Sequence, residues 1–179
     1  MPTLKDREAA GTPRPPSRGA VAAAARDDSD AKTLYEQDFF AWTNSQAALL
    51  RSGRLAQADI EHIAEEIEGM GKSELRELEN RLAALLLHLL KWQFQPQRRG
   101  RGWELAIREQ RRKLRRHIDQ NPSLRSRLDQ AMDDAYGDAI LTAARETDLP
   151  EETFPPLCPY TVEQTLDDCW LPDGQSAIR

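Results

Sequence analysis

An acidic segment carries the first side chains of this chain that could do chemistry. Between Asp59 and Glu79 lie eight aspartates or glutamates against one lysine and one arginine, a net charge of −6. His62 and Glu66 are four residues apart, so on a helix they would share a face, where an imidazole and a carboxylate can contribute to a metal site. The order His62-x-x-Glu65 reverses the Glu-x-x-His order of di-iron bundles and has no second copy. We therefore assign no metal ligands and favour a solvated acidic face that packs through an apolar stripe. The residues of this stripe are Ile60, Ile63, Ile67 and Met70.

A basic segment follows further along the chain. Between Arg98 and Arg116 lie nine arginines or lysines against two glutamates, a net charge of +7. A basic helix preceded by an Arg-Arg-Gly-Arg-Gly loop could follow a phosphate backbone. The arginines that would then contact nucleic acid are Arg98, Arg99, Arg101, Arg112 and Arg116. However, the whole chain has a net charge of −5, and no motif with base-reading spacing is present. We favour the alternative in which the basic segment neutralises the acidic one, within one chain or across a dimer.

A polar seam crosses the most apolar part of the chain. His88 lies seven residues after Arg81, three before Lys91 and seven before Gln95, so all four would follow one side of a helix. Such a histidine is more often hydrogen-bonded to a carboxylate than catalytic. We expect the acidic segment to be the partner of this seam, and a meeting of His88 with Glu65 or Glu66 would create a perturbed site.

Standard enzyme motifs are missing from the sequence. We find no nucleophile elbow, phosphate-binding glycine loop, zinc signature or HExxH motif, and we name no catalytic residue and no cofactor.

Prolines and glycines divide the chain into helical segments. We expect helices from a cap at Asp38 to about residue 52, from residue 57 or 59 to Gly69-Met70-Gly71, over about 73–94, over about 103–119, and from Asn121-Pro122 to about 147. A capping box at 161–164 predicts one more short helix. The segment 73–94 is apolar nearly all round, as in a helix surrounded by others. The sequence predicts an all-α fold, a bundle of about five helices around this central helix.

Length and composition agree with that fold. The chain has 179 residues, enough for one ordinary domain, and only two valines, too little β-branched material for a sheet. Residues 1–33 hold four prolines and no apolar period, which predicts a disordered tail before a single all-helical domain over 34–179. No apolar run is long enough for a membrane helix, and no export signal precedes the domain. We expect a cytoplasmic protein in which Cys158 and Cys169 stay reduced.

Several linked motifs resemble a known bacterial family. They include the run Tyr35–Trp42, the run Ala64–Gly71, the run Leu86–Trp92 followed by Gln95-Pro96, and Asn121-Pro122-Ser123-Leu124. Together they resemble the bacterial family called domain of unknown function 29, over about residues 34–171. The resemblance implies an all-helical protein and supplies no activity. The family's shared polar motifs fall on a set that we take as the candidate polar site: Glu65, Glu66, Glu68, His88, Lys91 and Arg111.

These observations favour an interaction or scaffold module without enzymatic activity. Its partner would be another protein or a second copy of the chain. Two alternatives stay open: a nucleic-acid-associated regulator that uses residues 98–116, and a metal-dependent or acid/base site built from His62, Glu65, Glu66 and His88.

Overall fold

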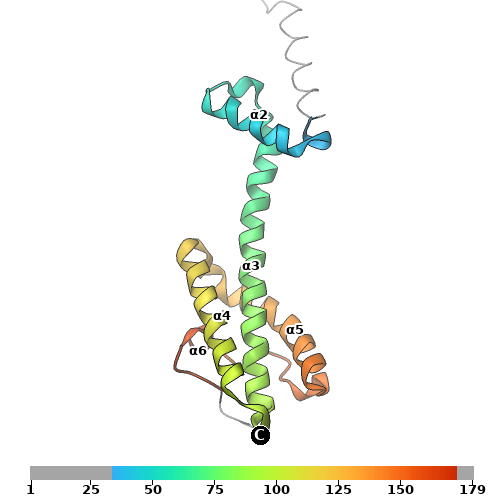
Figure 1. The fold of residues 1–179 in the computed structure, drawn as a ribbon, viewed down its shortest axis with the longest axis vertical. Helices are drawn as coiled ribbons and strands as arrows, with labels where there is room; N and C mark the ends of the chain where they lie inside the picture. Colours follow the sequence, from blue (N-terminus) through green and yellow to red (C-terminus); the bar gives the residue numbers. More distant parts are fainter. Residues whose placement is uncertain (1–33, 173–179) are drawn as a thin grey trace, which may run out of the picture. The chain divides into compact units, whose positions relative to one another are not determined.

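The computed structural model describes residues 34–172, which consist of helices and connecting loops without a strand (Figure 1). Residues 34–37 are helical, and the helices that follow are α2 (Phe39–Arg51), α3 (Ile60–Phe94), α4 (Arg101–Gln120), α5 (Leu128–Thr147) and α6 (Val162–Leu166). The predicted all-α fold is confirmed. The predicted disorder of residues 1–33 lies outside the described residues.

The described chain forms two compact units, one ending at Glu68 and the other beginning at Gly69. In the first unit Asp38 caps α2, because its carboxylate accepts a hydrogen bond from the backbone N–H of Ala41 at 2.9 Å. The helix ends before Gly53, whose φ of +70° is a left-handed conformation that glycine adopts readily. The predicted bounds of this first helix are confirmed, and the single domain over 34–179 stays a prediction.

The predicted end of a helix at Gly69-Met70-Gly71 is wrong. Helix α3 passes through these residues without interruption, so the expected second and third helices are one helix of 35 residues. A glycine inside a helix costs only about 1 kcal/mol relative to alanine. Neither glycine has a positive φ, and strong helix formers flank both, so the helix continues.

The predicted packing of the stripe that begins at Ile60 is also wrong. Ile60 is 53% exposed, Ile67 58% and Met70 62%, while Ile63 is half-buried. The spacing does place these side chains along one side of α3, but no described residue covers that side fully.

The second unit has the predicted central helix. Helices α4 and α5 lie on opposite sides of the C-terminal half of α3 (Figure 1). The core around this half contains six fully buried leucines of α3: Leu78, Leu82, Leu85, Leu86, Leu89 and Leu90. Helix α4 contributes Ile107, Leu114 and Ile118, and α5 packs through a row of alanines that permits close approach.

The ends of this unit follow local signals. A 3-10 helix (Pro122–Arg127) precedes α5, so the α-helix begins six residues later than predicted from Asn121-Pro122. Thr161 and Gln164 form the predicted capping box at the start of α6, with bonds of 3.2 and 3.0 Å. Cys158 and Cys169 are both free thiols. None of the described helices is both long enough and apolar enough to cross a bilayer.

Candidate functional site

A polar and aromatic cluster joins α2 to the start of α3 in the first unit. Asp59 is only 3% exposed, and its carboxylate contacts Nδ1 of His62 at 2.7 Å and accepts a hydrogen bond from the indole N–H of Trp42 at 3.3 Å. The backbone N–H of Asp59 donates to the side-chain oxygen of Gln46 at 2.9 Å. The His62 ring stacks on Tyr35, with ring centroids 4.1 Å apart. These contacts fix the angle at which the chain enters α3.

Glu66 belongs to the same cluster. The hydroxyl of Tyr35 donates a hydrogen bond of 2.6 Å to the Glu66 carboxylate. This bond, followed by burial and the charge of Glu66, raises the pKa of Tyr35 to about 12, because ionisation would place two negative charges side by side.

The two side chains whose spacing could contribute to a metal site, although we assigned no metal ligands, have other partners. His62 is held by Asp59, and Glu66 by Tyr35. Within residues 34–172, no three His, Cys, Asp or Glu side chains are grouped so that they could hold a metal ion.

The polar seam of α3 meets α5 in the second unit. Lys91 forms an ion pair of 2.7 Å with Glu146, and its ammonium lies 5.1 Å from the ring centroid of Trp103 on α4. Gln95 donates to the backbone carbonyl of Thr147 at 3.0 Å. We expected an acidic residue of the 59–79 segment to be the partner of this seam. The carboxylate that pairs with Lys91 comes instead from Glu146 of α5.

His88 lies in this seam, in surroundings that disfavour its protonated, charged form. Burial and the nearby ammonium of Lys91 lower its pKa, and the carboxylates of Glu146 and Glu109 oppose that shift only in part. Its Nδ1 atom is buried without a hydrogen-bond partner among the described residues, as are Nε of Arg81 and Oε1 of Gln95. His88 is accordingly a neutral side chain near neutral pH.

Arg111 is buried, although it belongs to a run of basic residues. The side chain is 1% exposed, and its guanidinium donates to the carbonyls of Thr165 at 2.9 Å, Trp170 at 2.8 Å and Gln164 at 3.4 Å. Burial lowers its pKa. Arg111 therefore fastens the C-terminal segment to α4.

The candidate polar site thus falls into separate places. Glu65, Glu66 and Glu68 belong to the first unit, where Glu65 and Glu68 are exposed. His88 and Lys91 share the seam of α3 in the second unit, while Arg111 bonds to the C-terminal segment. Glu74 of the acidic segment does contact the end of α4, where its carboxylate lies 3.6 Å from Nδ1 of His117 and accepts a hydrogen bond of 3.0 Å from the side chain of Asn121.

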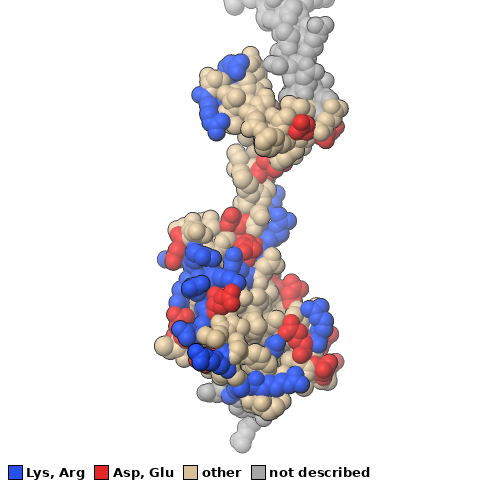
Figure 2. Space-filling view, viewed as in Figure 1, with Lys and Arg blue, Asp and Glu red and all other residues tan. Residues whose placement is uncertain are grey.

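The five arginines expected to contact nucleic acid are unequal. Arg99 donates to the backbone carbonyl of Trp92 at 2.7 Å and lies over its ring. The other four are exposed: Arg98, Arg101, Arg112 and Arg116. Figure 2 shows basic side chains gathered over α4.

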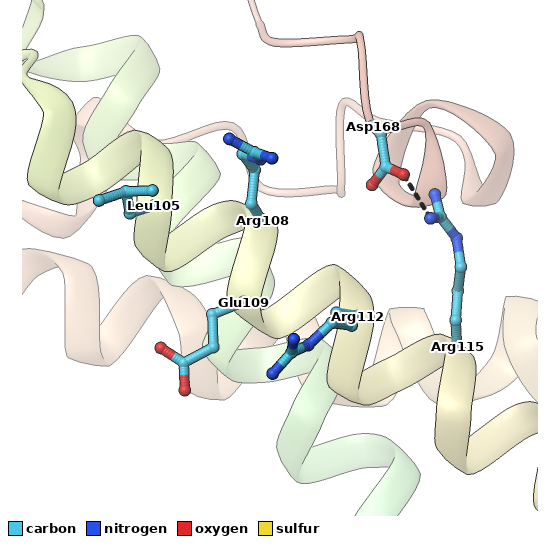
Figure 3. Close-up of a pocket in the computed structure, with 6 residues that line it drawn as sticks. All are labelled: Leu105, Arg108, Glu109, Arg112, Arg115 and Asp168. Carbon is cyan, nitrogen blue, oxygen red and sulfur yellow. Dashed lines mark hydrogen bonds and ion pairs between the residues drawn. The ribbon is translucent and has the colours of Figure 1, made fainter.

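Part of that basic surface is hollowed. A pocket of about 560 Å³ lies along α4, and Figure 3 shows the six residues that line it. They are Leu105, Arg108, Glu109, Arg112, Arg115 and Asp168. Arg115 donates to the carboxylate of Asp168 and to the carbonyl of Leu166. Sequence reasoning selected Arg112 alone from this set, although the spacing of 105, 108, 112 and 115 on a predicted helix indicates a shared face.

Comparison with known proteins agrees with the resemblance drawn from the motifs. No curated protein and no solved structure gave a significant match. One family model matches residues 34–171, which covers the described chain except its last residue. The chain belongs to the family described as Domain of unknown function DUF29.

Proposed function

We propose that this chain is a protein-interaction module, and that residues 34–68 bind a basic, amphipathic helix of a partner protein. The observation that carries the proposal is the exposure of large apolar side chains on this unit. Phe40 is 78% exposed, and Ile60 and Ile67 are each more than half exposed. Soluble monomers seldom leave many such groups uncovered on a small surface.

The limited burial within residues 34–68 supports the same conclusion. Trp42 is the one fully buried apolar side chain among these residues, so the described chain itself covers little of their apolar surface. A partner that covers the exposed side chains would supply the missing burial.

The spacing of the exposed Ile60 and Ile67 and of the half-buried Ile63 between them favours a helical partner. Ile60, Ile63 and Ile67 are separated by three and four residues, the repeat with which one helix packs along another. Recognition through anchors at this spacing is a recurring way in which proteins bind an amphipathic helix.

The charge of the unit favours a basic partner over a second copy. Residues 34–68 contain seven aspartates or glutamates against two arginines. Two copies meeting through this surface would bring like charges together, whereas a partner with lysines or arginines beside its apolar stripe would be attracted and oriented.

A photo-crosslinking amino acid at position 67 tests the proposal in native cells. The matched control is position 141, because Leu141 on α5 is 55% exposed and Ile67 is 58% exposed. We expect position 67, and not position 141, to capture a protein whose crosslinked segment is a basic amphipathic helix. With that segment in purified form, Ile67→Ser should weaken binding about tenfold or more through lost apolar burial, and Leu141→Ser should not.

Two outcomes would contradict this function. One is capture of a second copy from position 67 together with a dimer mass by light scattering. The other is crosslinking from position 67 only to residues of the same chain.

A further inference from the structure

The pocket along α4 has a lining with a regular order. Leu105, Arg108, Arg112 and Arg115 follow one another at spacings of three, four and three residues, so they lie along one face of the helix (Figure 3). Asp168, from the segment after α6, completes the lining.

The wall opposite α4 is held in place by two arginines of that helix. Arg111 binds the carbonyls of Thr165 and Trp170 from within the core, and Arg115 binds the Asp168 carboxylate. The pocket is therefore a preformed feature of the second unit, since its two sides are tied together by hydrogen bonds on either side of Asp168.

Some charged side chains of the pocket form ion pairs and others do not. Glu109 pairs with Lys113 at 2.6 Å, and Asp168 pairs with Arg115; each of these contacts lowers the pKa of the carboxylate, so both acids are ionised. Arg108 and Arg112 have no hydrogen-bond or ion-pair partner among residues 34–172 and act on these carboxylates only at longer range, where Arg112 lowers the pKa of Glu109 and Arg108 that of Asp168. Two positive charges are thus left without a direct partner on adjacent turns of one helix.

We propose that this pocket binds the phosphate monoester group of a small molecule of nucleotide size. A phosphate monoester carries a charge of about −1.5 to −2 at pH 7, which matches the two unpaired guanidinium groups. The planar donors of Arg108 and Arg112 suit the oxygens of phosphate, with which arginine forms paired hydrogen bonds.

The remaining lining fits the rest of such a molecule. Leu105 is 48% exposed and offers an apolar contact at one end of the row. The carboxylates of Glu109 and Asp168 can accept hydrogen bonds from ligand hydroxyl groups. The volume of about 560 Å³ lies in the ordinary range of small-molecule sites.

The same two carboxylates argue against a nucleic-acid strand. A strand that crossed the pocket would bring successive phosphates close to Glu109 and Asp168, where like charges repel. A single phosphate monoester brings one such group to the pocket, whereas a strand brings several. This inference concerns the second unit and is independent of the function proposed for residues 34–68.

Titration calorimetry on the full chain tests the site with four probes at fixed ionic strength. The probes are inorganic phosphate, adenosine 5′-monophosphate, adenosine and a single-stranded oligouridylate. We expect the two phosphate-bearing small molecules to bind, adenosine to bind at least tenfold more weakly than its monophosphate, and the oligonucleotide to gain nothing over the monophosphate.

Two double variants with equal charge loss separate the pocket from the general basic surface. Arg108→Gln with Arg112→Gln should weaken monophosphate binding about a hundredfold, near tenfold for each charge-assisted contact. Arg101→Gln with Arg116→Gln removes two exposed arginines of α4 that do not line the pocket. This double variant should change the affinity for the monophosphate less than threefold. Unchanged circular dichroism would show that both variants fold.

The proposal is overturned by absence of binding of both phosphate probes at millimolar concentration, or by equal binding of adenosine and its monophosphate. Equal losses in the two double variants would show diffuse attraction instead of a site. Tighter binding of the oligonucleotide that depends on Arg101 and Arg116 would assign the surface to a nucleic-acid strand.

Discussion

Replacing Arg111 with methionine should destabilise the second unit and release its C-terminal segment. Methionine keeps much of the volume and removes every donor from a side chain that is 1% exposed. The carbonyl of Thr165, now bonded at 2.9 Å, would lose its partner in a buried place, and that of Trp170, bonded at 2.8 Å, would lose its partner in a partly buried one.

The size of the effect follows from those bonds. A hydrogen bond to a charged group contributes about 1.5–3 kcal/mol to stability. The two short bonds to Thr165 and Trp170 therefore account for most of the expected loss, and the 3.4 Å contact to Gln164 adds little. Relief from burying a charge offsets part of this, since burial already lowers the pKa of Arg111. We expect a net loss of about 2–4 kcal/mol, a large share of the ~5–15 kcal/mol of a typical domain.

Guanidinium denaturation and hydrogen exchange measure the two parts of this prediction. The denaturation midpoint should fall. Relative to the unsubstituted chain, exchange of the backbone amides over residues 162–172 should speed up more than exchange of those in α3. Arg116→Met is the matched control, because Arg116 lies on the same helix and is exposed, and it should change stability by less than about 0.5 kcal/mol. A similarly small change for Arg111→Met, with unchanged exchange at 162–172, would refute the assignment of Arg111 as the fastening residue.

Three further predictions concern α3. Leu86→Asp should prevent cooperative unfolding of a soluble chain, because Leu86 is fully buried and an unpaired carboxylate there costs several kcal/mol; a normal thermal melt would contradict this. Gly71→Ala should stabilise the chain by about 0.5–1 kcal/mol, since Gly71 is inside a helix and a Cβ there meets nothing within 4 Å, whereas a lower midpoint would indicate a turn. His88 has a lowered pKa, so the unfolded chain binds its proton first as the pH falls below about 6.5. The free energy of unfolding should therefore decrease below that pH, and His88→Gln should make the decrease smaller; an identical pH profile in the variant would show that His88 does not contribute.

The helices whose ends carry local signals could be predicted from the sequence. The Asp38 cap, the Gly53 stop and the capping box at Thr161 each act within four residues, and the structure has them where expected. The core followed from the density of leucines over residues 82–94, because a helix that is apolar all round has to be surrounded.

The uninterrupted course of α3 could not be predicted in the same way. Two glycines around Met70 cost about 1 kcal/mol each in a helix, and the same residues can also end one. Which outcome prevails depends on flanking propensity and on the packing of the rest of the helix, and neither is a property of the three residues themselves. The periodicity of Ile60 and Ile67 likewise shows that an apolar side exists, without showing what covers it.

The partners of the polar side chains were hidden by distance along the chain. Glu66 meets Tyr35 across 31 residues, and Lys91 meets Glu146 across 55. The pairing of Asp59 with His62 could have been predicted from the sequence. A carboxylate just before a helix ordinarily caps it by bonding to the residue three positions later, and Asp59 and His62 have this spacing.

Helix α4 shows how the sequence can separate arginines that composition groups together. The apolar residues Trp103, Ile107, Leu114 and Ile118 are spaced by four, seven and four residues, and the long step leaves position 111 on the buried side of the helix. An arginine there has to find acceptors inside the protein, and Arg111 does so in backbone carbonyls. Arg108 and Arg112 are turned away from that stripe by the same period, so they line the pocket instead, while Arg115, one turn after Arg111, reaches the pocket from the edge of the stripe. The phase of each arginine relative to the apolar stripe therefore separates a buried fastening role from a surface role, and the net charge of the segment does not.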